Sequence, residues 1–196
     1  MPSSSIQLIV GLGNPGAEYR ETRHNAGYWF VEDVAERHGC CFRSERRFHG
    51  DTCMFTLEGR ACRLLKPTTF MNRSGQSVAA LVNYYRIPLE QVLVVHDELD
   101  LPPGAVRLKQ GGGHGGHNGL RDIISVLGGR DFWRLRVGIG HPGDSRKVVG
   151  YVLGRPSKED DLSIRDALSR AEDELPDILG GAFQRVMNRL HTAAPP

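Results

Sequence analysis

The chain has 196 residues, with 25 Lys and Arg against 23 Asp and Glu and a formal net charge of +2 at pH 7. This length is typical of one domain with a sizeable core. The net charge is too small to indicate a class of binding partner. No apolar run approaches the roughly 20 residues that span a bilayer, and no basic, apolar leader precedes Ile6. We therefore expect a cytoplasmic protein without a membrane segment, forming one domain over residues 1–196 with loose ends at about 1–5 and 192–196.

The first apolar run, residues 6–10, predicts a buried strand, and the next residues read GLGNPG. This is the G-x-G-x-x-G spacing of dinucleotide-binding domains. However, Pro15 stands where the helix of that motif would already be running, and no acidic residue ends a second strand about 20 residues later. We therefore interpret Asn14-Pro15-Gly16 as a tight turn rather than a phosphate cradle.

The later elements follow from apolar periodicity and from Gly and Pro breaks. In chain order we expect a helix over 25–38, strands over 52–57 and 61–65 joined by a turn at 58–60, a helix capped by Ser74 and ending before Pro88, strands over 92–95 and 105–109, a helix over 120–127, a strand over 135–139, and amphipathic helix from Ser157 onward. Strands alternating with helices predict an α/β fold with a mixed sheet.

Charge is unevenly distributed along the chain. Residues 101–150 contain eight Lys and Arg against three acids, whereas residues 156–181 contain three bases against eight acids. Charge runs are usually solvated faces, but basic residues beside a glycine-rich loop weakly favour a phosphate ligand.

The four cysteines are Cys40, Cys41, Cys53 and Cys62. They form no C-x-x-C pair and belong to no motif of a catalytic nucleophile, which argues against disulfides and against a reactive thiol. We expect small buried hydrophobic residues in a protein of a reducing compartment.

Three loops place a polar side chain among glycines or prolines: NPG with Asn14, TTFMNRSG with Asn72, and GGHNG with His117 and Asn118. A single amide in a turn usually stabilises only the turn itself. Three such loops, each next to a predicted strand or helix, favour a common site.

His24 precedes the first predicted helix, and Asp97 ends the most hydrophobic strand. A histidine at a helix start is often only a cap, but a carboxylate at the tip of a buried strand needs a partner. An imidazole would serve, because the carboxylate would fix one tautomer and leave the other ring nitrogen free as a general base. His114 and His117 lie in a flexible glycine loop without nearby thiolate or carboxylate ligands, so we expect no metal site.

Five motifs in order resemble those of the bacterial peptidyl-tRNA hydrolases: GLGNPGAEYRETRHNAG, KPTTFMNRSG, HDELDLPPG, GGGHGGHNGL and RLRVGIGHPGD. The resemblance covers residues 6–190. It implies a single-domain mixed sheet of the phosphorylase/hydrolase-like kind, with helices on both faces and at the C-terminal end. It also implies a monomeric cytoplasmic enzyme without cofactor or metal, which hydrolyses the ester between a peptide or N-acyl-amino acid and the 3′-terminal ribose of tRNA and so recycles tRNA.

The resemblance assigns roles residue by residue. It implies that His24 is the catalytic base, that Asp97 orients it, and that Asn14 is a catalytic amide. It implies a substrate-binding set of Tyr19, Phe70, Met71, Asn72, His117 and Asn118. Lys109 and Arg136 correspond to a pair that clamps the tRNA 5′-phosphate. The implied partner is peptidyl-tRNA, through its acceptor stem, CCA end and nascent peptide.

Two other functions fit the same architecture. One is a catalytically silent RNA-binding module, which would have no reason to keep His24 together with Asp97. The other is an enzyme similar to nucleoside phosphorylases, for which we find no phosphate and ribose pocket in the sequence.

Overall fold

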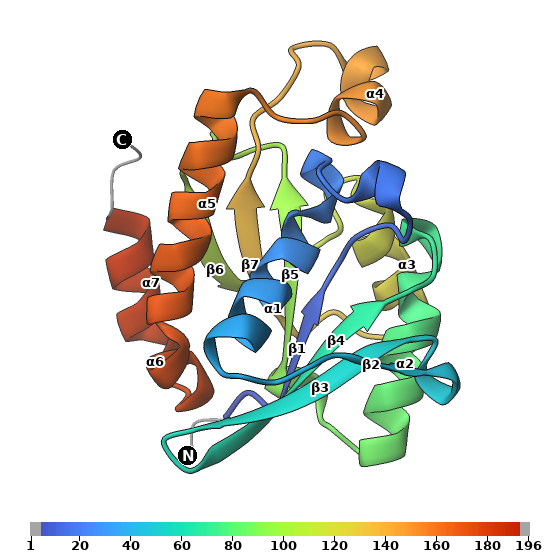
Figure 1. Ribbon diagram of the computed structural model, residues 1–196, viewed down its shortest axis with the longest axis vertical. Coiled ribbons are helices and arrows are strands. Elements are labelled where there is room, and N and C mark those ends of the chain that lie inside the picture. The colour runs from blue at the N-terminus through green and yellow to red at the C-terminus, as the bar shows by residue number, and fades with distance from the viewer. Residues whose placement is uncertain (1–4, 193–196) are drawn as a thin grey trace.

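Strand β1 (Leu8–Gly11) lies at the centre of a seven-stranded sheet whose order is β2-β3-β4-β1-β5-β7-β6 (Figure 1). All four of its residues are buried, as the apolar run over 6–10 predicts. The structure is a computed structural model, and it describes residues 5–192.

The sheet is mixed. Its inner strands β4, β1, β5 and β7 run parallel, and the outer strands run antiparallel to their neighbours. Besides β1, the strands are β2 (Arg43–Glu45), β3 (Gly50–Leu57), β4 (Arg60–Pro67), β5 (Val92–Glu98), β6 (Val106–Gln110) and β7 (Trp133–Gly138). Because the inner strands are parallel, their carboxyl ends meet at one edge of the sheet.

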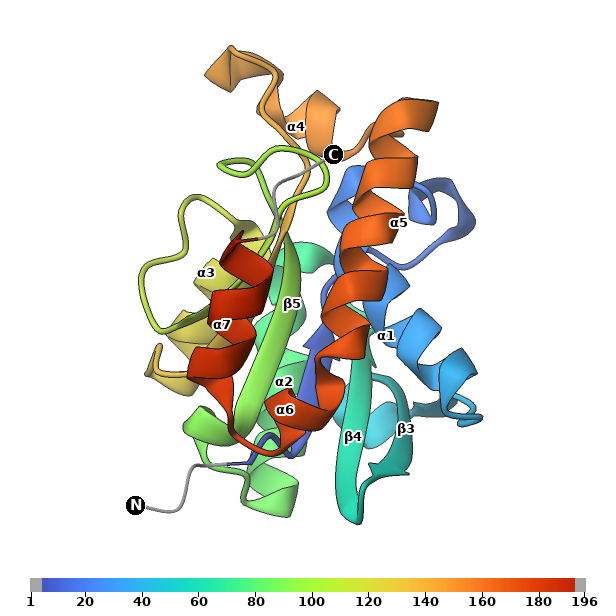
Figure 2. The same ribbon diagram turned by 90° about the vertical axis from the view of Figure 1, so that its left-hand side faces the viewer.

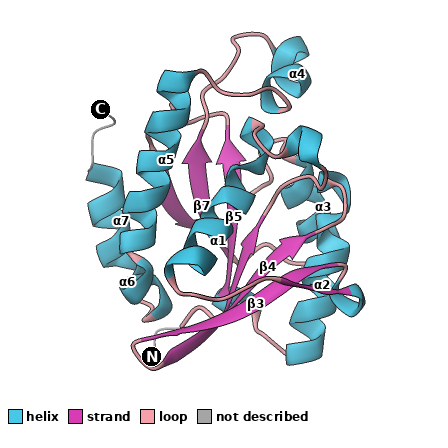
Figure 3. Cartoon of the chain, in the orientation of Figure 1, coloured by secondary structure: helices cyan, strands magenta, loops and turns pink. Residues whose placement is uncertain are grey.

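Helices cover both faces of the sheet, so the expected α/β architecture is confirmed (Figures 1 and 3). One core cluster joins the sheet to α1 (Ala26–Arg37), α5 (Lys158–Asp173), α6 (Leu175–Leu179) and α7 (Phe183–Thr192). A second cluster joins the other face to α2 (Ser74–Tyr85) and α3 (Asn118–Leu127). The short α4 (Val148–Val152) stands beyond the carboxyl edge of the sheet, as Figure 2 also shows.

Six short 3-10 helices connect these elements. They are η1 (Ala17–Tyr19), η2 (Arg23–Asn25), η3 (Arg46–Phe48), η4 (Met71–Arg73), η5 (Leu89–Gln91) and η6 (Ser145–Lys147). Within residues 5–192, no helix has the length and apolar character needed to cross a membrane.

Glycines at the end of β1 and in α1 allow close packing. A Cβ on Gly11 would meet the carbonyl oxygen of Gly27 at 2.3 Å, and a Cβ on Gly27 would meet the carbonyl oxygen of Val95 at the same distance. Both glycines are therefore needed for α1 to approach β1 and β5. Gly16 has a φ of 113° and closes the turn that begins at Asn14.

The sequence interpretation was wrong at several positions. Strand β2 was not expected because it is a short edge strand rich in charge, and α4 was not expected because it follows a polar loop. Ser74 is not the cap of α2 but its first residue; its hydroxyl donates to the carbonyl of Met71. Thr192, expected to be loose, ends α7, whereas the expected loose segments 1–4 and 193–196 lie outside the described residues.

The expectation of four buried cysteines is also wrong. Cys62 is buried, but Cys40 and Cys53 are half-buried and Cys41 is exposed. Cys40 and Cys41 follow α1, whereas Cys53 lies in β3 and Cys62 in β4.

Candidate active site

A cleft of about 540 Å³ opens at the carboxyl edge of the parallel strands. From β1 the chain continues to β2 at one edge of the sheet, and from β5 it continues to β6 at the other edge. Such a reversal of direction between neighbouring strands is where α/β sheets form ligand crevices. The lining comes from the turn after β1, from η2 and η4, from the end of β5, from the start of α3 and from the segment 141–153.

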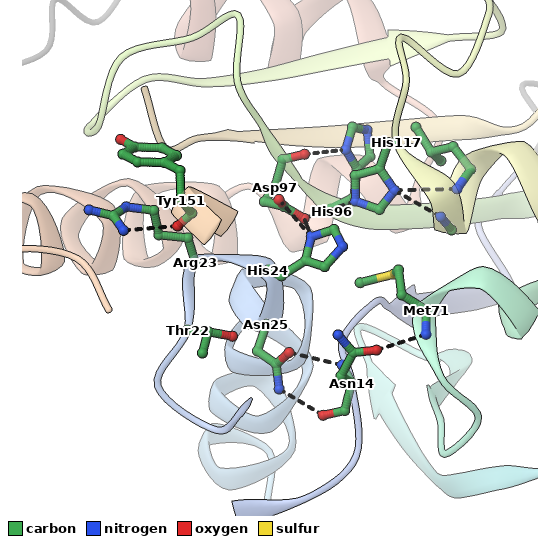
Figure 4. A network of polar contacts seen from close by, with 12 residues as sticks. Asn14, Thr22, Arg23, His24, Asn25, Met71, His96, Asp97, His117 and Tyr151 are labelled. Carbon is green, nitrogen blue, oxygen red and sulfur yellow. Dashed lines mark hydrogen bonds and ion pairs between the residues drawn. The ribbon is translucent and has the colours of Figure 1, made fainter. Parts of the chain in front are cut away.

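His24 and Asp97 lie against each other in this cleft, as the sequence predicts. The Nδ1 atom of His24 is 3.0 and 2.9 Å from the two carboxylate oxygens of Asp97. Both side chains are buried, with 10% and 2% of their surfaces exposed. Figure 4 shows the His24 ring between Asp97 and Asn14.

His117 gives Asp97 a second imidazole partner. Its Nε2 is 2.8 Å from Oδ1 of Asp97, and its Nδ1 accepts the backbone N–H groups of Gly119 and Leu120. His117 is thus the N-cap of α3. The sequence expectation that His117 has no carboxylate nearby is wrong, because folding brings Asp97 to it from β5. Its resemblance-based role as a substrate-binding residue stays a prediction.

These hydrogen bonds fix the proton positions. Because Nδ1 of His117 accepts two N–H groups, its proton is on Nε2, which donates to Asp97. The carboxylate only accepts, so Nδ1 of His24 also donates to it. The Nε2 atom of His24 has no hydrogen-bond partner among residues 5–192, and it keeps a free lone pair in the cleft.

The electrostatics of the pair favour an ionised Asp97. Burial alone would lower the pKa of His24, but the charge and hydrogen bond of Asp97 outweigh it and raise that pKa above 6.5. Burial would raise the pKa of Asp97, yet the two imidazoles hold it well below its usual range. Neighbouring His96 stays neutral, because burial lowers its pKa to about 3.

His24, Asp97 and His117 each offer a ligand atom, and these atoms lie within 4.8 Å of one another. Two imidazoles and a carboxylate are a donor set that suits zinc. Here the same atoms are hydrogen-bonded to each other, and His117 also caps α3, so a metal would have to displace these bonds. The absence of a metal from the reaction stays a prediction.

Asn14 is held at both its backbone and its side chain. The Asn25 amide accepts the N–H of Asn14 at 2.9 Å and donates to its carbonyl at 3.0 Å. The Oδ1 atom of Asn14 accepts the backbone N–H of Met71 at 2.8 Å (Figure 4). This leaves the side-chain NH₂ group of Asn14 as the donor at the cleft. Asn25 was not predicted from the sequence, although this residue follows His24 directly.

Phe70, Met71, Asn72 and Asn118 also line the cleft. Met71 is buried, whereas Phe70, Asn72 and Asn118 are exposed. The Asp122 carboxylate on α3 accepts the N–H of Gly75 at the start of α2, at 2.7 Å. This bond joins α3, whose first residue is Asn118, to the start of α2, which directly follows η4 with Asn72.

The segment 141–153 forms the opposite wall of the cleft, which the sequence analysis did not predict. Val149 and Leu153 expose 69% and 38% of their surfaces, so this wall offers apolar area to a ligand. Arg23, the residue before His24, contacts this wall at Tyr151. Its guanidinium lies 3.9 Å from the Tyr151 ring centre and donates to the Tyr151 carbonyl at 3.0 Å (Figure 4).

Three of the predicted site residues do not line the cleft. Tyr19 is half-buried in η1. Lys109 is exposed on β6, and Arg136 on β7 forms an ion pair with Glu98 at 2.8 Å. The pairing of Lys109 with Arg134, two residues before Arg136, makes Lys109 and Arg136 diagonal neighbours on one face of the sheet.

Comparison with known proteins gives a consistent result. Residues 8–196 match the family profile described as peptidyl-tRNA hydrolase. The chain is 58% identical to the peptidyl-tRNA hydrolase of Pseudomonas syringae pv. tomato, covering 96% of this chain and 98% of that one. It is 53% identical to that of Neisseria meningitidis serogroup A, covering 97% and 99%. The crystal structure of peptidyl-tRNA hydrolase from Acinetobacter baumannii superposes with a TM-score of 0.96 at 48% identity, covering 98% of each chain.

Proposed function

Since this chain belongs to the peptidyl-tRNA hydrolase family and hydrolyses peptidyl-tRNA, we propose that His24 is the general base of the reaction and Asp97 the group that orients it. His24 accepts a proton at Nε2 from a water molecule as the water oxygen attacks the ester carbonyl carbon. The Asp97 carboxylate stabilises the imidazolium that forms, and it keeps the ring in the tautomer that the reaction needs.

The negative charge that develops on the carbonyl oxygen needs a hydrogen-bond donor. We propose the NH₂ group of Asn14 as this donor; the hydrogen bonds from Met71 and with Asn25, which hold the rest of that residue, support the assignment. A single preorganised donor of this kind contributes about 2.7–4 kcal/mol to transition-state stabilisation. When the intermediate collapses, the ester C–O bond breaks and the imidazolium returns its proton to the ribose oxygen.

The observation that supports this proposal most is the free Nε2 lone pair of a buried His24 whose Nδ1 is held by Asp97. A silent RNA-binding module does not need such a pair. The hydrolysis shared by the family and by close relatives also disfavours that alternative.

The pH dependence of turnover tests the assignment of His24. A protonated imidazole cannot act as a base, so kcat/KM should fall as the pH drops through the pKa of His24. Because Asp97 raises that pKa, the midpoint should lie above 6.5 in the wild type. In Asp97→Asn, burial is no longer opposed by the carboxylate charge, and the midpoint should move to lower pH. An acidic limb that stays in place in Asp97→Asn would assign it to another group.

We further propose that Lys109 and Arg136 bind a phosphate of the tRNA. Their common face on the β6–β7 pair and the exposure of Lys109 support this. Arg136 forms an ion pair with Glu98. Replacing Arg136 would therefore also leave the Glu98 carboxylate at the cleft without this partner. Lys109 is for this reason the cleaner position to test.

Lys109→Ala should raise KM and leave kcat nearly unchanged, because the lysine contacts substrate away from the ester. Each lost phosphate contact removes about one unit from the slope of log affinity against log salt. The measurement is KM over a series of salt concentrations, with exposed Lys158→Ala as the matched control. Equal salt slopes in Lys109→Ala and Lys158→Ala would remove Lys109 from the tRNA contact.

We also propose that the protein acts as a monomer in the cytoplasm, where its tRNA substrate is produced. Membership of the family supports this proposal.

A further inference from the structure

Two free cysteines from different elements meet at the end of α1 that is remote from His24. Cys40 follows α1, and Cys53 lies in β3. Their Sγ atoms are 3.1 Å apart, in a thiol–thiol hydrogen bond. Disulfide formation brings two sulfur atoms to about 2.0 Å, so an approach of about 1 Å is required.

We propose that Cys40 and Cys53 are a modification site that forms a reversible disulfide when the protein meets a hydroperoxide such as hydrogen peroxide. This inference does not depend on the ester hydrolysis, since neither thiol lines the catalytic cleft. In a reducing compartment such a pair is a thiol pair at rest and becomes a disulfide only under oxidation.

The chemistry uses one peroxide for each pair of thiols. The Cys40 thiolate attacks one peroxide oxygen; the S–O bond forms, the O–O bond breaks, and the departing hydroxide is protonated to water. The Cys53 sulfur then attacks the Cys40 sulfur, so that the S–S bond forms and the S–O bond breaks. The departing hydroxide takes the Cys53 proton, which makes the second water.

The order of the two steps follows from the surroundings of the thiols. Burial, together with the hydrogen bond from Cys40, raises the pKa of Cys53 to about 12. Cys53 therefore stays a neutral thiol near pH 7, which leaves the first attack on the peroxide to Cys40. Cys53 gives up its proton only in the second step, when its sulfur attacks the oxidised sulfur of Cys40.

The remaining cysteines serve as internal comparisons. Cys62 is buried in β4, and burial raises its pKa, so we expect it to be inert. Cys41 is exposed and is the thiol through which two copies of the chain could be cross-linked.

The disulfide would close the chain between residues 40 and 53 and fasten the end of α1 to β3. A covalent loop restricts the unfolded chain more than the folded one, so we expect Tm to rise by about 5 °C. We expect kcat to be unchanged, because His24 precedes the opposite end of α1.

The test is to treat the protein with hydrogen peroxide, block remaining thiols by alkylation, and map the peptides by mass spectrometry. We expect a peptide pair joined through Cys40 and Cys53, about 2 Da lighter than the two free peptides and separated again by a reductant. Cys41→Ser and Cys62→Ser should give the same result with the same rise in Tm. Cys40→Ser and Cys53→Ser should give neither.

The wild-type map decides the question even if a serine variant fails to fold. A wild-type protein in which Cys41 is oxidised or joins two copies, while Cys40 and Cys53 remain free thiols, would overturn the proposal. A 40–53 link that leaves Tm unchanged would overturn the stabilising role.

Discussion

His24→Ala is expected to lower kcat by about 10²–10⁴, the range typical of a lost general base. The Nε2 lone pair in the cleft disappears, while the charges proposed to hold the tRNA remain. Affinity for an uncleaved tRNA should therefore stay within about twofold, because the lost interaction belongs to the transition state. The measurements are single-turnover release of N-acetyl-amino acid from tRNA and direct tRNA binding.

His38→Ala is the matched control for this variant, because His38 follows the opposite end of α1 and lies outside the cleft. It should keep wild-type turnover. Asp97→Asn should lose a substantial fraction of what His24→Ala loses, since the amide NH₂ group cannot accept an N–H from both imidazoles. Near-normal kcat in His24→Ala would remove the assigned base.

N-acetyl-aminoacyl-tRNA is expected to be cleaved about 10²–10³ times faster than unacylated aminoacyl-tRNA. If Asn72 and Asn118 bind the peptide backbone, their NH₂ groups donate to the acyl carbonyl, which a free α-amino group lacks. Fully buried donors can discriminate by about 10⁴–10⁵. Here both amides are exposed, so water can partly replace the missing carbonyl, and we expect the smaller ratio.

The comparison requires both substrates at equal enzyme concentration, with release of the labelled amino acid followed over time. Asn72→Ala and Asn118→Ala should reduce the ratio, whereas Asn83→Ala, an exposed amide on α2, should leave it unchanged. Equal rates for the two substrates in the wild type would contradict backbone recognition by these amides.

The fold was predictable where a buried element leaves a regular pattern of apolar residues in the sequence. The apolar runs of β1 and β5 mark strands covered on both faces, and the resemblance predicted helices on both sides of the sheet. Strand β2 was not predictable, because its residues Arg43–Glu45 show no apolar alternation and pair only with β3. The order of the strands also depends on tertiary packing that no local pattern encodes.

For the candidate site, the need of a buried Asp97 for an imidazole could be argued from desolvation alone. The second imidazole could not, because His117 reaches Asp97 only when the N-terminus of α3 is placed beside β5. Asn25 was missed for a similar reason, since its two bonds to the Asn14 backbone depend on the turn of η2. Polar contacts between residues that are distant in the sequence leave no periodic pattern from which they could be predicted.

The contacts between Arg23 and Tyr151 limit which segments of this enzyme can be exchanged with those of a relative. Besides the guanidinium contacts, the backbone N–H of Arg23 donates to the carbonyl of Gly154 at 3.0 Å. A chimera that receives residues 141–154 from a relative would therefore give Arg23, the residue before His24, new neighbours. Such a chimera should keep its catalytic activity only when the residues at positions 23 and 151 are exchanged together.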